Sequence, residues 1–181
     1  MAEWLTHVLL AFALFTALGW VIEWIDEGWV AVGMIGSILP DLNRLELIVP
    51  ADTVSAIAGV PFQWGGLHTI GGAVLLAGLG ALLFDTRTRQ WRAFLVLFGG
   101  ALWHLIVDLP QQYADGAMLT NLYLFPIASW RPPTPGWYVS DDRWVVVGAA
   151  LIALVVWLLD RYYIDRRPTP RSTDRSKNDN C

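Results

Sequence analysis

A histidine and an aspartate four residues apart, His104 and Asp108, lie inside the apolar run GGALWHLIVDLP at residues 99–110. Positions i and i+4 of a helix share one face, so both side chains would point the same way. A charged side chain at the centre of a membrane helix costs about 2.5–3.5 kcal/mol on the insertion scale. The pair is therefore expected to bind something that compensates for its burial, and a cation would do so.

The same ligand chemistry recurs at three other positions in the chain, namely His7, His68 and, in the turn LPDLN, Asp41. Neutral imidazoles and carboxylates together form a nitrogen and oxygen site that suits zinc first, with iron or manganese as alternatives. We expect a divalent metal to be held by ligands drawn from His68, His104, Asp108 and Asp41, with His7 either as a further ligand or as support behind the ligands. Such a set leaves room for an activated water, as metal-assisted hydrolysis requires. Asp41 or Asp108, whichever is not a ligand, would then serve as the general base.

Each residue also has a plainer interpretation. A lone histidine near the end of a membrane helix is usually an interfacial hydrogen-bonding residue, and this applies to His7 taken alone. Asp108, two residues before Pro110, would mark the exit of a helix into water, and Asp41 beside Pro40 would be a turn residue. Considered as a set on shared helix faces within the membrane, however, the residues favour a functional site.

The composition indicates an integral membrane protein. Among the 181 residues, 55% are hydrophobic, only 15% are charged and eleven are tryptophan, a residue that favours the headgroup level of a bilayer. The net charge of −4 provides no basic patch, which argues against nucleic acid as a partner. The single cysteine, Cys181, excludes a disulfide framework within the chain.

The length of the apolar stretches predicts an all-α fold, a polytopic transmembrane helix bundle. A span needs roughly 17–25 apolar residues, and four stretches meet this: Trp4–Ile25, Gly66–Phe84, Ala93–Leu109 and Trp144–Ile164. Gly28–Leu39 has about half the usual length and would be a short tilted helix or a re-entrant one. We therefore predict about five membrane helices, one of them short, in a single domain at residues 1–165. The polar residues 166–181 should form a disordered tail, and residues 44–63 an interfacial lip.

The distribution of arginine predicts the orientation. Lys and Arg gather in cytoplasmic loops, and two arginine clusters flank the last spans, at residues 87–92 and 166–171. Both are cytoplasmic if the long loop at residues 110–142 lies outside. With Gly28–Leu39 as a crossing, all three histidines and both aspartates then converge on the outer membrane face. A re-entrant Gly28–Leu39 would instead place the N-terminus in the cytoplasm and remove His7 from the site.

Several short motifs resemble a known family when taken in order. The stretches ILPDLN, His68-Thr69, GALWHLIVD and NLYLFPIASW are similar to elements of the membrane-bound, metal-dependent hydrolases of prokaryotic inner membranes (the LexA-binding, inner-membrane-associated hydrolase type). The likeness covers about residues 5–130. It implies a multi-pass protein of the prokaryotic plasma membrane and assigns the ligand roles to the same five positions. A distant motif similarity to zinc-dependent phospholipase C is also implied.

Three positions depart from that family's pattern. Asn43 stands where a second carboxylate is usual, Gly65-Gly66-Leu67 replaces a His-Arg pair, and Thr69 follows His68 instead of preceding it. These changes bear on the metal site and on substrate binding.

Two functions remain open from the sequence. The first is a metal-dependent hydrolase acting on a phosphoester or another lipid-derived ester at the outer membrane face, with membrane lipids as partners and substrate source. The aromatic loop at residues 113–137 would admit such a lipid sideways. The second is a non-enzymatic membrane protein whose polar cluster binds a metal or protons structurally. An intramembrane zinc protease is disfavoured because the His-Glu-x-x-His motif is missing.

Overall fold

The structure, a computed structural model, describes residues 2–112, 123–128, 135–139 and 142–166. These residues form six α-helices, two 3-10 helices and a minimal pair of strands. In chain order the elements are α1 (Ala2–Gly19), α2 (Glu27–Gly36), η1 (Leu39–Leu47), α3 (Ala51–Ala58), η2 (Trp64–His68), α4 (Ile70–Ala81), α5 (Arg87–Asp108), β1 (Gln111–Gln112), β2 (Tyr138–Val139) and α6 (Arg143–Arg166). The helical prediction is confirmed in its main feature, and the parallel pair β1–β2 is the one departure from an all-α chain within the described residues.

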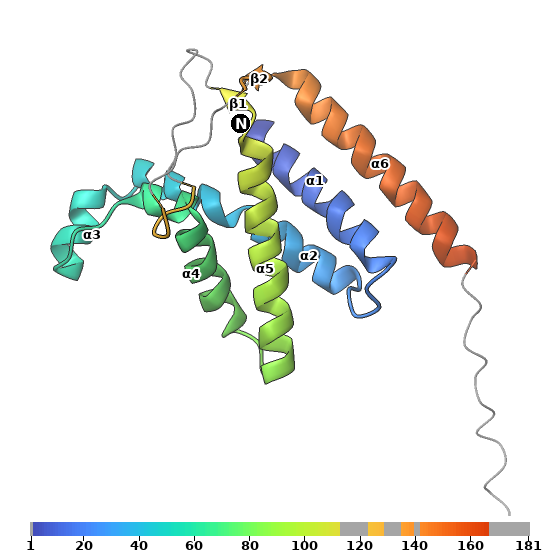
Figure 1. The fold of residues 1–181 in the computed structure, drawn as a ribbon, viewed down its shortest axis with the longest axis horizontal. Coiled ribbons are helices and arrows are strands. Elements are labelled where there is room, and N and C mark those ends of the chain that lie inside the picture. The colour runs from blue at the N-terminus through green and yellow to red at the C-terminus, as the bar shows by residue number, and fades with distance from the viewer. Residues whose placement is uncertain (1, 113–122, 129–134, 140–141, 167–181) are drawn as a thin grey trace, which may run out of the picture.

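Helix α5 is the central element of the bundle. It packs against α4 on one side and α2 on the other, while α1 packs against α2 and α6. The first turns of α1 and the last turns of α5 lie at the same end of the molecule, beside β1 and β2 (Figure 1). Residues near the start of the chain and near position 108 are therefore neighbours.

The structure supports fewer membrane helices than the five expected. Among the described residues, two helices are long and apolar enough to cross a membrane, Arg87–Asp108 and Arg143–Tyr162. At 1.5 Å per residue the 22 residues of α5 extend for about 33 Å. The 12 residues of α4 reach only about 18 Å, and the 10 residues of α2 still less. The apolar part of helix α1, Trp4–Gly19, is also too short to count as a full membrane span.

Local capping explains why the helix ends differ from the predicted spans. Thr69 accepts a hydrogen bond from the backbone N–H of Gly72 and so starts α4 at Ile70, four residues later than expected. Thr86 accepts one from the N–H of Arg89, which brings the polar residues Arg87–Arg92 into α5. Helix α1 ends at Gly19, and the residues that follow form turns. In the first of these turns the N–H of Ile22 donates to the carbonyl of Leu18 at 2.8 Å. The apolar run to Ile25 is thus a turn.

Helix α6 contacts the rest of the molecule through a narrow face. Only 11% of its most apolar stretch, within Arg143–Tyr162, is buried, and Trp144 and Leu151 are both more than half exposed. Near its far end, Asp160 accepts a hydrogen bond of 2.8 Å from the indole of Trp20 and fixes α6 against the end of α1. An apolar surface of this extent suits lipid, which supports the membrane interpretation.

The predicted interfacial lip resolves into the end of η1 and the short helix α3. No residue of α3 is buried, and its eight residues are far too few to span a bilayer. Ile48 and Ile57 are both more than three-quarters exposed. Most of the predicted long loop (residues 113–122, 129–134 and 140–141) and of the predicted tail (residues 167–181) lies outside the described residues.

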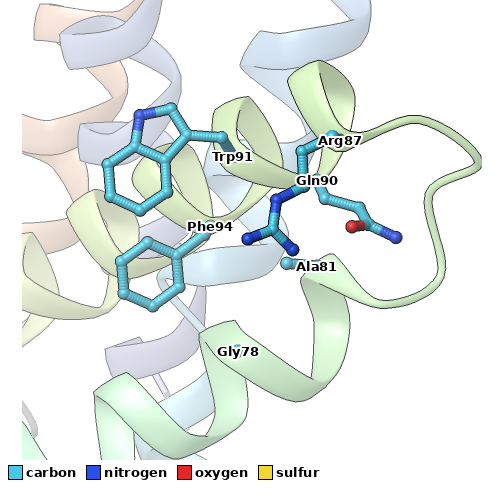
Figure 2. A pocket seen from close by; sticks show the side chains of 6 residues that line it. All are labelled: Gly78, Ala81, Arg87, Gln90, Trp91 and Phe94. Atoms are coloured by element: carbon cyan, nitrogen blue, oxygen red, sulfur yellow. The ribbon is translucent and has the colours of Figure 1, made fainter.

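A cavity of about 390 Å³ lies between the end of α4 and the start of α5. Figure 2 shows the side chains of Arg87, Trp91 and Phe94 around it. It is at the arginine-bearing end of α5, whereas His104 and Asp108 are at the other end of the same helix.

Candidate metal centre

Asp108 is the centre of a buried polar cluster. The Nε2 atom of His7 lies 3.0 Å from its Oδ1, and the Nε2 atoms of His68 and His104 lie 3.1 and 3.2 Å from its Oδ2. One carboxylate at the end of α5 thus meets three imidazoles from three different elements. The structure brings together His7, His68, His104 and Asp108, which the sequence places up to 101 positions apart.

Asp41 completes the set from η1. Its Oδ1 lies 4.0 Å from the Nε2 of His104. Two overlapping groups of ligand atoms, each with all atoms within 4.8 Å of one another, result: His7, Asp41 and His104 in one, and His68, His104 and Asp108 in the other. All five residues are buried, with exposures between 0% and 6%. A cluster of titratable groups this dry needs internal compensation.

The hydrogen bond to Ser37 defines how His104 is protonated. The Nδ1 of His104 lies 2.7 Å from the backbone carbonyl oxygen of Ser37. A carbonyl can only accept, so Nδ1 must carry the hydrogen and donate it. In the neutral ring, Nε2 then carries no hydrogen, and its lone pair faces the carboxylates of Asp108 and Asp41. Two lone pairs at 3.2 Å repel each other unless a proton or a metal cation lies between them, and metal-binding histidines are commonly held in this tautomer by a carbonyl.

The hydrogen bonds of the cluster fit the same picture. Within the described residues, neither the Nε2 of His68 nor that of His104 makes a hydrogen bond of acceptable geometry, and the Oδ1 of Asp108 also lacks one. Buried polar atoms without a partner are rare in folded proteins. Here they point inward at short mutual distances, so the donor set and its burial fit a metal ion with nitrogen and oxygen ligands.

The imidazole rings pack against one another. The ring of His7 stacks on that of His104 with centroids 3.8 Å apart and an interplanar angle of 21°. His68 meets His104 edge-on at 5.1 Å, and the ring of Tyr123 lies 6.1 Å from His68 on the other side. These contacts restrict ring rotation and hold the ligand atoms toward Asp108.

Glycines allow the helices that carry the site to approach closely. A Cβ at Gly100 would overlap the carbonyl of Gly33 and lie 2.8 Å from the backbone nitrogen of Ser37. A Cβ at Gly36 would lie 2.9 Å from the Cα of Leu97. Helices α2 and α5 are therefore in backbone contact one turn before His104, which brings the Ser37 carbonyl within reach of its ring.

The position of His68 depends on the start of α4. His68 ends η2, and the hydroxyl of Thr69 both accepts from Gly72 and donates to the carbonyl of Gly66 at 2.7 Å. The backbone of Tyr123 and Phe125 accepts hydrogen bonds from the N–H groups of Ile70 and Gly71. The described part of the motif NLYLFPIASW, residues 123–128, thus closes the free end of α4 and places Tyr123 beside His68.

Two residues beside the site have no counterpart in the sequence prediction. The first is Ser37, whose role rests on a backbone carbonyl that no side-chain pattern indicates. The second is Arg44, whose Nε lies 3.4 Å from the Oδ1 of Asp41 and whose guanidinium lies 5.8 Å from the ring centroid of Trp4. The contact between Asp41 and Arg44 could have been predicted from their spacing, because residues three apart lie on one face of a helix. The side-chain oxygen of Asn43, Oδ1, is buried and makes no hydrogen bond within the described residues.

The comparisons with known proteins place the chain in a family. A family model described as YdjM inner membrane protein matches residues 1–168. The chain therefore belongs to the YdjM inner membrane protein family, whose name gives a location and no reaction. No match was found among curated proteins or among solved structures.

Proposed function

For this member of the YdjM inner membrane protein family, we propose a metal-dependent hydrolase that acts on a phosphoester or another lipid-derived ester. The observation that carries the proposal is the hydrogen bond from His104 to the Ser37 carbonyl. It directs a lone pair of His104 at two buried carboxylates, and a divalent cation is the simplest partner for all three groups. The resemblance of the motifs to inner-membrane hydrolases agrees with this proposal.

His68, His104 and Asp108 would hold the metal, with His7 and Asp41 as further ligands. Zinc is the first candidate because it binds mixed imidazole and carboxylate sites, and iron or manganese would accept the same donors. A divalent cation bound here would act as a Lewis acid and lower the pKa of an attacking water toward about 7.

The chain's own residues would supply orientation and proton transfer. Asp41 is farther from the histidines than Asp108 is, at 4.0 Å from His104, so it is the better placed of the two carboxylates to accept a proton as general base. The ring stack of His7 on His104 and the edge contact of His68 would keep the ligands in place during the reaction.

The orientation follows from the two ends of α5. Arg87, Arg89 and Arg92 lie in its first turns, and His104 and Asp108 in its last two. By the positive-inside rule the arginine end faces the cytoplasm and the cluster faces the outer side of the membrane. The enzyme would therefore act on lipid-derived substrates of the outer leaflet.

A non-enzymatic protein with a structural cluster is the second candidate. Its support is that a protonated histidine between the carboxylates would also satisfy the geometry of His104. In that case the cluster would stabilise the bundle, with a proton or a structural metal between its ligands, and would catalyse no reaction.

Two measurements on purified protein separate the candidates. The first is metal content by mass spectrometry after purification without added metal, and the second is turnover of generic phosphodiester and phosphomonoester substrates. Bound zinc, iron or manganese together with turnover that a chelator abolishes supports the hydrolase. A metal-free protein that also fails to bind added zinc would defeat it.

A further inference from the structure

A second cavity, of about 350 Å³, borders the metal centre through Asp41. The same carboxylate that faces His104 on one side forms the cavity wall on the other. Arg44 and Trp4 stand beside Asp41, and the remaining lining is aliphatic: Ile38, Leu42, Leu45, Leu47 and Ile48. The cavity is thus charged where it borders the metal centre, at Asp41 and Arg44, and its wall is otherwise apolar.

We propose that this cavity binds a membrane lipid that carries an anionic phosphate, with the phosphate at Arg44 and the hydrocarbon chain along the aliphatic wall. The inference rests on the proposed function, for which it names the substrate class and the binding residue. It differs from the expectation that the aromatic loop at residues 113–137 admits the lipid.

Charge supports a phosphate at this end of the cavity. The side chain of Arg44 is 38% exposed, and its Nε is directed at Asp41. A guanidinium presents its N–H donors in a planar fork, a geometry that matches a phosphate. A divalent cation bound at the centre would add two positive charges beside Arg44 and so favour an anion at this end of the cavity.

Size and surroundings support a lipid over a small soluble phosphate. The volume is at the lower end of the range for small-molecule sites, about 300–1,000 Å³, so it holds a headgroup and only the start of a chain. Leu47 and Ile48 at the cavity wall are 87% and 78% exposed, and Ile57 of the adjoining α3 is 83% exposed. A chain that leaves the cavity therefore continues over an apolar surface that also suits the bilayer.

The test measures binding of a short-chain phosphonate analogue of phosphatidic acid, which cannot be hydrolysed at the phosphate ester, to the full-length protein in detergent. Diacylglycerol of the same chain length tests the phosphate contribution, and inorganic phosphate tests the chain contribution. We expect the analogue to bind at least about tenfold more tightly than either, since a hydrogen bond to a charged group and apolar burial each contribute about that factor.

Arg44→Gln should weaken binding of the analogue about tenfold or more and leave metal content unchanged. The matched control is Arg92→Gln, because Arg92 also lies over a tryptophan ring, 5.0 Å from that of Trp24, but at the other end of α5. It should leave affinity within about twofold, the error of such a titration. Arg44→Lys, which keeps the charge but loses the planar fork, should bind the analogue with an affinity between those of the wild type and Arg44→Gln. An unchanged metal content in both variants shows that they are folded.

Ile48→Asn tests the aliphatic wall at an exposed position that tolerates a neutral polar residue. It should weaken the analogue several-fold without changing the affinity for inorganic phosphate. Equal binding of diacylglycerol, equal binding of inorganic phosphate, or an unaltered affinity of Arg44→Gln would each overturn the inference. Because binding is measured without turnover, a protein that binds the analogue but hydrolyses no ester refutes the hydrolase and leaves this site standing.

Discussion

The imidazole of His7 stacks face to face on the imidazole of His104, with ring centroids 3.8 Å apart. The two residues come from the start of α1 and the end of α5, so these two helix ends lie at the same level of the bundle. The alternative in which His7 lies at the opposite membrane face from the other histidines is therefore incompatible with the fold. His7 is part of the cluster, and its Nε2 contacts Asp108 directly.

Asp108→Asn should strongly lower bound metal while leaving the fold largely intact. The amide keeps the shape of the carboxylate but removes the charge that three histidines surround. Metal content of the purified variant is the measurement. Asp85→Asn is the matched control, since Asp85 is an exposed carboxylate paired with Arg89 at the far end of the molecule. Wild-type metal content in Asp108→Asn would contradict a ligand role for Asp108.

His104→Leu should abolish metal binding and make thermal stability insensitive to a chelator. Leucine suits the membrane better than imidazole, but the Ser37 carbonyl loses its partner, so we expect a loss of about 0.6–2 kcal/mol, the range for a membrane hydrogen bond. The wild type, in contrast, should lose thermal stability when a chelator is added, because a ligand bound only to the folded state stabilises it. A wild type whose unfolding temperature does not respond to chelation would favour the purely structural cluster.

Gly100→Ala should destabilise the protein by about 1–3 kcal/mol, the usual range for overpacking, and weaken metal binding as well. The added methyl meets the backbone of Gly33 and Ser37, and it would push the Ser37 carbonyl away from His104. Gly148→Ala in α6 is the control, because a Cβ there meets nothing within 4 Å, and it should be neutral or slightly stabilising. Unfolding midpoints and zinc affinities of both variants check this, and equal behaviour of the two would refute the close-contact argument.

The orientation can be tested by labelling single cysteines in intact cells, in a Cys181→Ser background. Glu46→Cys, at an exposed polar position in the same 3-10 helix as Asp41, should react with a membrane-impermeant reagent added outside. Thr88→Cys, in the first turn of α5, should react only after the membrane is opened. Labelling in the reverse order would place the cluster on the cytoplasmic side.

The sequence was informative about the site because helix geometry is local. The four-residue spacing of His104 and Asp108 places them on one face whatever surrounds them, and the small residues next to them predict close helix packing, which Gly100 shows against α2. The contact of Ser37 with His104 was not predictable, because it joins a backbone carbonyl to a side chain 67 positions away. Only the packing of α2 on α5 creates it.

The described helices support fewer membrane spans than the apolar stretches predicted, for a physical reason. Apolar composition does not distinguish a helix from an apolar turn, so the stretch from Trp4 to Ile25 was predicted as one span although α1 ends at Gly19. At the other helix ends, single hydroxyls such as those of Thr69 and Thr86 decide where helical hydrogen bonding begins. These caps shift boundaries by several residues without changing the hydropathy of the segment.

His104 belongs to both ligand groups, and this overlap would limit how many metal ions the centre can bind at once. Its Nδ1 is committed to the Ser37 carbonyl, so only Nε2 remains for coordination, and one imidazole nitrogen lone pair serves a single cation. The two groups would therefore be alternative positions of one ion, and we expect a titration with zinc to saturate at a stoichiometry of one. An ion on the His68 and Asp108 side leaves Asp41 uncoordinated, whereas an ion on the His7 and Asp41 side releases Asp108.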